Sequence, residues 1–147
     1  MACQNQKGFA LIELSIVVVV IALIVAGVVA GQSLVRQAGI RAVITDINKY
    51  KTTVNTFFLK YNELPGDMTK ASLYWAGAPN GNGNKIIYGG DEIGNAWHHL
   101  SLSNLVAEPY PVGNGFNSTP GEHAPKAPLS EGGISFYPID YNTNNFF

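Results

Sequence analysis

The chain has 147 residues, of which 46% are hydrophobic and only 13% are charged, and its formal net charge is −1. This length leaves room for one domain beside a membrane segment, and the charge balance lacks the basic footprint of a nucleic-acid-binding protein. The single cysteine is Cys3, so no intrachain disulfide can form.

An uncharged apolar run dominates the N-terminal part of the chain. The run Leu14–Val35 has about 22 residues, or roughly 33 Å of helix, which is enough to cross a bilayer. A secretory signal peptide would have a more basic start than Lys7 alone and a shorter apolar core. Glu13 lies just inside the edge of the run, where an unpaired carboxylate costs about 2–3 kcal/mol or more. The sequence therefore predicts a partner for Glu13.

The residues around Glu13 form a recognisable pattern. Gly8 to Leu14 reads Gly-Phe-Ala-Leu-Ile-Glu-Leu, which resembles the processing site of type IV prepilins and of type II secretion pseudopilins. The pattern of that family is a short basic leader ending in Gly, then Phe, two or three apolar residues, Glu and a long apolar helix. The resemblance covers residues 7–35, which is 29 of the 147 residues.

The resemblance implies a processing step and an assembly step. A membrane-embedded aspartyl peptidase would cut after Gly8 and N-methylate the new terminal Phe9. Glu13 would pair with the Phe9 amine of a neighbouring subunit, so its charge would be neutralised only on assembly. The implied partners are the inner membrane, the prepilin peptidase and N-methyltransferase, and other copies or related pilin subunits, with no nucleic acid. The alternative is that Glu13 reaches the lipid headgroups of a simple anchor.

The predicted organisation follows from this segment. Residues 1–8 are the leader, 9–35 the transmembrane and assembly helix, and 36–147 a periplasmic pilin-like domain. The chain would cross the bacterial inner membrane once and enter a periplasmic or extracellular filament after assembly. Arg36 and Arg41 after the apolar run, against Lys7 before it, favour the opposite orientation. The resemblance takes precedence, because the leader must reach a peptidase at the cytoplasmic face.

The helix is expected to continue beyond the membrane. Apolar residues recur at alternating spacings of three and four, at Ile40, Val43, Ile47, Tyr50, Val54, Phe57 and Tyr61. No proline occurs between Phe9 and Pro65. The pattern predicts one helix from about Phe9 to about Tyr61, whose second half is amphipathic and covered by the soluble domain. A separate coiled-coil dimer is the alternative.

Two glycines lie in the membrane half of this helix. Gly27 and Gly31 form a small-xxx-small motif, which allows helices to approach closely in an apolar environment. This favours helix packing within a filament core. The alternative is that glycine is simply frequent in membrane helices.

Turn chemistry predicts where the long helix ends. Asn62 can adopt the left-handed conformation, and Leu64-Pro65-Gly66-Asp67 places Pro and Gly at the centre of a type II turn. Asp67 or Thr69 is expected to cap a short helix over residues 71–75.

A Gly- and Asn-rich stretch covers residues 77–94, with a short strand expected at 86–88. Four residues of this stretch are spaced like the ligands of a calcium-binding loop: Asn80, Asn82, Asn84 and Asp91. Asp91 is the twelfth residue when Asn80 is counted as the first. Lys85 replaces the turn glycine, and the asparagines bring no charge. We therefore expect a flexible surface loop and no cofactor.

A second helix is predicted over residues 95–106. His98 and His99 point about 100° apart on it and cannot chelate one metal, so helix capping and surface polarity account for them. Strands are expected at 133–138 and 141–147. The predicted fold class is α+β, a long N-terminal helix packed on a small antiparallel sheet.

No catalytic or metal-binding motif appears in a convincing context, and we expect no enzyme. The sequence predicts a structural subunit of a type IV pilus or a type II secretion pseudopilus. The alternative is a periplasmic binding module or enzyme that a signal helix anchors and that never enters a filament.

Overall fold

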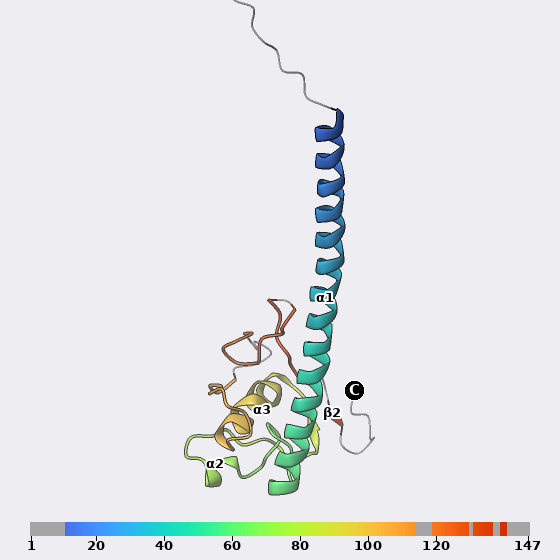
Figure 1. The fold of residues 1–147 in the computed structure, drawn as a ribbon. Helices are drawn as coiled ribbons and strands as arrows, with labels where there is room; N and C mark the ends of the chain where they lie inside the picture. The colour runs from blue at the N-terminus through green and yellow to red at the C-terminus, as the bar shows by residue number, and fades with distance from the viewer. Residues whose placement is uncertain (1–10, 114–118, 130, 137–138, 141–147) are drawn as a thin grey trace, which may run out of the picture. The chain divides into compact units, whose positions relative to one another are not determined.

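The computed structural model describes residues 11–113, 119–129, 131–136 and 139–140 (Figure 1). The chain divides into two compact units, Met1–Gly39 and Ile40–Phe147. Its elements in chain order are α1 (Leu11–Tyr61), α2 (Ala71–Tyr74), β1 (Ile86–Ile87), α3 (Gly90–Leu102) and β2 (Ile139–Asp140).

Helix α1 has 51 residues and confirms the prediction of one long helix ending at Tyr61. The predicted stop signals act as expected. Asn62 has a φ of 56°, and its N–H donates the last helical bond to the carbonyl of Phe58. The N–H of Asp67 donates to the carbonyl of Leu64 at 3.2 Å, and Gly66 has a φ of 84°, which together form the type II turn.

Glycine is required at position 66 by contact as well as by conformation. A Cβ there would lie 2.2 Å from the carbonyl oxygen of Glu92 and 3.1 Å from the backbone nitrogen of Ala96. Both atoms belong to α3. The turn after α1 therefore rests directly on the backbone of α3, with no room for a side chain between them.

Aromatic side chains fill the space between α1 and α3 within the unit Ile40–Phe147. The rings of Tyr50 and Trp97 meet edge to face with centroids 4.8 Å apart. The ring of Phe57 lies parallel to His99 with centroids 6.5 Å apart. Aromatic side chains bury a large apolar area per residue, so a small unit can build its core from few residues. Figure 1 shows α3 beside the C-terminal part of α1.

The predicted apolar stripe is covered only in part. Tyr50, Val54 and Phe57 are buried, as the amphipathic pattern predicts. Ile40 and Ile47 remain 46% and 39% exposed. The described residues of the unit Ile40–Phe147 thus cover the end of the stripe and leave Ile40 and Ile47 partly open.

The predicted small antiparallel sheet is not confirmed. Strands β1 and β2 pair antiparallel, with Ile86 opposite Asp140 and Ile87 opposite Ile139. Each is two residues long, and among the described residues they form the only ladder. Of the strand expected at 133–138, the described residues 133–136 contribute one bridge, between Lys126 and Gly133. Gly132-Gly133 weakens strand formation at one end, and Pro138 lacks the N–H that a ladder needs. The strand expected at 141–147 lies outside the described residues.

Helix α3 begins and ends earlier than predicted. Its first turn contains Asp91 and Glu92, acidic residues that favour a helix N-terminus and extend it ahead of the predicted start at residue 95. At the other end, the N–H of Asn104 donates to Ser101 O and the N–H of Leu105 to Leu100 O. With Asn104 at a φ of 57°, this is a Schellman motif, and it stops the helix before Val106.

The predicted cap of the short helix is wrong. Helix α2 follows Lys70 and has no side-chain cap hydrogen bond. Thr69 instead contacts Glu63, which accepts bonds from both the N–H and the hydroxyl of Thr69. Asp67 binds backbone groups much farther along the chain. Either side chain could have capped α2, but Thr69 is hydrogen-bonded to Glu63 and Asp67 to residues 83–85.

Candidate functional site

The first half of α1 presents an extended apolar surface. All Leu, Ile and Val side chains from Leu11 to Val35 are exposed, by 47% to 89%. Among the described residues, α1 is the one helix long and apolar enough to cross a membrane, judged by length and composition. A surface of this size in a folded chain marks contact with lipid or with another protein. An N-terminal apolar helix of this kind fits membrane anchoring.

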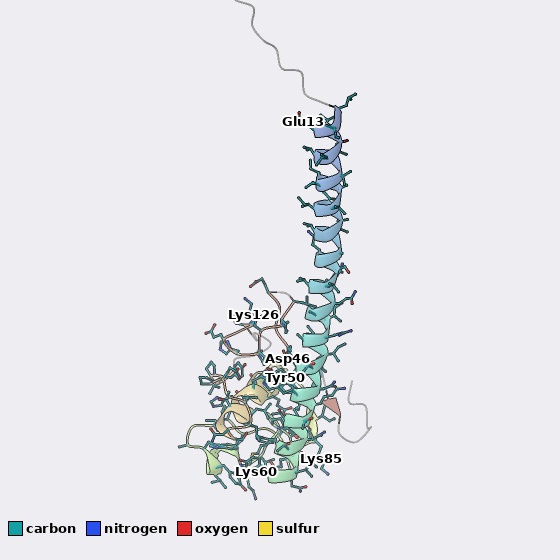
Figure 2. The ribbon with its side chains drawn as sticks, in the orientation of Figure 1. Glu13, Asp46, Tyr50, Lys60, Lys85 and Lys126 are labelled. Atoms are coloured by element: carbon teal, nitrogen blue, oxygen red, sulfur yellow. The ribbon has the colours of Figure 1, made fainter. Side chains whose placement is uncertain are left out.

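Glu13 is the single charged residue between Leu11 and Val35. It lies in the first turn of α1, where its negative charge interacts favourably with the helix dipole. Its side chain is exposed (Figure 2). The next residues on every side are apolar. The structure therefore places one carboxylate at the N-terminal edge of the apolar surface, where another chain can reach it.

The processing residues Gly8 and Phe9 lie outside the described residues. The cut after Gly8, the methylation of Phe9 and the pairing of Glu13 with a neighbouring Phe9 amine stay predictions. So do the domain boundaries at residues 8 and 35.

Among the described residues, Gly27 and Gly31 have open space where a side chain would begin. A Cβ added at either position meets no described residue within 4 Å, and neither glycine needs a left-handed conformation. Glycine in a helix nevertheless costs about 1 kcal/mol relative to alanine. Close approach of a second helix would offset this cost, since small residues let two helices pack closely in an apolar environment.

The residues of the calcium-like pattern are used to shape a loop. The side-chain oxygen of Asn80 accepts a bond from the N–H of Ser72, that of Asn82 from Asn84, and that of Asn84 from Ile86. Three of the four residues, Asn80, Asn82 and Asp91, line an open hollow of about 370 Å³. Within the described part of the chain, no three His, Cys, Asp or Glu side chains gather as a metal group would require. The expectation of no cofactor stays a prediction.

Two buried carboxylates hold this loop, and sequence reasoning missed both roles. The Asp67 carboxylate accepts bonds from the N–H groups of Gly83, Asn84 and Lys85, at 2.7, 3.2 and 2.8 Å. Glu92 accepts from the side-chain amide of Asn82 and from the N–H of Tyr88. The loop is thus tied to the turn after α1 and to the first turn of α3. The sequence does show acidic residues beside a Gly-rich stretch, but this pattern does not indicate which backbone groups they bind.

The interpretation of His99 as a surface or capping residue is wrong. His99 has no exposed surface, and both ring nitrogens bind backbone groups. His98 is half-buried, and its Nδ1 lies 2.7 Å from the carbonyl oxygen of Tyr110. Burial lowers the pKa of His99 to about 4, which the bond to Pro79 opposes and neighbouring His98 reinforces.

Comparison with known families identifies the N-terminal segment. Residues 3–29 match the model described as the prokaryotic N-terminal methylation motif. This motif is the prepilin-type cleavage and methylation segment of type IV pilins and pseudopilins, and it belongs to structural proteins, not to an enzyme family. The match confirms the resemblance and supports a type IV pilin-like or pseudopilin precursor. No curated protein and no solved structure matches the chain.

Proposed function

We propose that this chain is a structural subunit of a type IV pilus or of a type II secretion pseudopilus. It is processed after Gly8, N-methylated at Phe9 and assembled through the first half of α1. The observation that supports the proposal is the methylation motif at residues 3–29, continued by a helix whose Leu, Ile and Val side chains from Leu11 to Val35 are all exposed. Before assembly the chain spans the inner membrane once, with residues 36–147 in the periplasm.

The chemistry of assembly follows from the new N-terminus. Cleavage after Gly8 creates an α-amine on Phe9, whose ordinary pKa is about 8, and N-methylation keeps it cationic. Glu13 offers an exposed carboxylate one helical turn farther on. Opposite charges in a low-dielectric environment attract far more strongly than in water. A pair formed between subunits would therefore set the register in which one helix docks on the next.

The state of the N-terminus tests the processing step. We expect protein taken from membranes to begin with N-methyl-Phe9 when the intact mass and the terminal peptide are measured. The leader would then be missing from every copy that has entered a filament. An intact Met1 on otherwise folded, membrane-bound protein would contradict the proposal and favour a module anchored by an unprocessed signal helix.

Replacing the proposed partner of the amine tests the assembly step. We expect Glu13→Gln to remain membrane-inserted and cleaved, because a buried amide costs less than a buried carboxylate and the cut lies about four residues away in the sequence. Its incorporation into filaments should fall sharply, since the incoming amine would be buried without a counter-charge. The measurement is the share of each variant in sheared filaments or cross-linked oligomers after co-expression with wild type.

Glu108→Gln is the matched control, because it makes the same change at an exposed position of the soluble unit. This variant should enter filaments as wild type does. Equal incorporation of Glu13→Gln and wild type would show that the ion pair does not drive assembly, while leaving the processing step intact.

A further inference from the structure

The two ring nitrogens of His99 bind two distant points of the backbone. The N–H of Gly66 donates to Nδ1 at 2.9 Å, and Nε2 lies 2.9 Å from the carbonyl oxygen of Pro79. Because Nδ1 accepts, the proton of the neutral ring must sit on Nε2, which donates to Pro79. The ring packs beside Phe57 and Trp75, with centroids 6.5 and 6.2 Å away.

These two points are the ends of one segment, residues 66–79, which we name the α2 segment. It includes α2 and carries the exposed side chains of Leu73 and Tyr74. Both of its ends bind a single imidazole of α3. The His99 ring therefore attaches both ends of the α2 segment to α3. We call this pair of hydrogen bonds the His99 clasp.

A proton added to this ring removes one of the two bonds. The imidazolium has two N–H donors and no acceptor, so its Nδ1 would face the N–H of Gly66 donor to donor. Burial makes the charged form costly and lowers the pKa of His99 from 6.5 to about 4, with opposition from the Pro79 bond and reinforcement from His98. Since the folded value lies below the unfolded value, the clasp is fully stabilising above about pH 6.5. That stabilisation is lost as the pH falls from 6.5 towards 4.

Other groups on the surrounding elements titrate or carry charge. They are Lys60 and Tyr61 on α1, Glu63 and Asp67 after it, Lys70 before α2, and Glu92 and His98 on α3. Asp67 and Glu92 matter most, because their carboxylates hold the loop that follows the α2 segment. The experiment must therefore separate His99 from these two carboxylates.

We propose that His99 is an acid-sensitive clasp, and that a proton on its ring releases the α2 segment from α3 while α1 and α3 stay folded. The released segment exposes Met68 and Ala71, which are buried when the clasp is closed. Acid would thereby change the surface that carries Leu73 and Tyr74.

Amide hydrogen exchange on the full chain in detergent micelles tests this proposal between pH 7.5 and 4.5. After correction for intrinsic exchange rates, we expect the opening equilibrium of Gly66 and the α2 segment to rise about tenfold per pH unit below 6.5. Amides of α1 between residues 47 and 61 should keep their protection. A flat profile in the α2 segment, or a joint loss of protection in α1, would overturn the proposal.

Two variants assign the effect to one ring. In His99→Gln, the side-chain amide can accept a bond from Gly66 and donate one to Pro79, and it does not titrate in this range. The opening equilibrium of the α2 segment should therefore no longer depend on pH. His98→Gln, the matched control, should keep this dependence. If His99→Gln shows the wild-type slope, the carboxylates carry the response and the clasp is refuted. If that variant fails to fold, the imidazole proton resonances of wild-type His99 decide. They must titrate with a pKa well below 6.5, and an ordinary pKa near 6.5 would refute the clasp.

Discussion

A Gly8→Val precursor is expected to stay uncut, to retain Met1–Gly8 and to be absent from filaments. Glycine has no side chain, which suits a peptidase that must accept an extended backbone at the bilayer surface, and a β-branched residue adds two methyl groups at the bond to be cut. Without the cut there is no amine on Phe9 and no counter-charge for Glu13. Intact mass of the membrane-bound protein gives the result directly.

Gly27→Val is the matched control for this prediction. It makes the same substitution in the first half of α1, where an added Cβ meets no described residue within 4 Å. We expect normal cleavage of this control, whatever its effect on assembly. Normal cleavage of Gly8→Val would remove the prepilin-type processing from the proposed function.

Val54→Asp is expected to unfold the soluble unit. The Val54 side chain is only 5% exposed and belongs to the core with Tyr50, Phe57 and Trp97. A carboxylate buried there without a partner costs several kcal/mol, against a total stability of about 5–15 kcal/mol for an ordinary domain. Loss of near-ultraviolet circular dichroism and rapid proteolysis of a fragment beginning at Arg36 would report the unfolding.

Leu59→Asp provides the comparison, because it makes a similar change on the same helix where the side chain is 84% exposed. Its effect should lie within about 0.5 kcal/mol of wild type. The unchanged fragment from Arg36 should be soluble, folded and mainly monomeric. A stable dimer that Val54→Asp dissociates would instead favour the coiled-coil alternative for the stripe.

The parts of the fold that local chemistry controls could be predicted. A run without proline, a periodic apolar face and the sequence Asn62 to Asp67 define where α1 extends and how it stops, since each signal acts within a few residues. The same holds for the methylation motif, in which the residue types and their order identify the segment before any coordinates exist. Glu13 stood out because a charge in an apolar run is costly by itself.

The parts that depend on distant partners could not be predicted. The sequence shows that Asp67, Glu92 and His99 are polar, but not that backbone groups up to 33 positions away would bind them. Once Asp67 binds residues 83–85, it is no longer available to cap α2. The expected sheet failed for a related reason, because strand propensity over a few residues does not guarantee a long partner strand.

The tie between Asp67 and residues 83–85 has a consequence for how the chain reaches its folded state. It closes a loop of the kind that exported proteins often close with a covalent cross-link, and loop closure limits the freedom of the unfolded chain. Here the closure consists of three N–H groups on one carboxylate. Since Cys3 is the single cysteine, no thiol oxidant or disulfide isomerase has a step to catalyse within one chain. Folding of this unit is therefore indifferent to the redox state of the compartment that receives it.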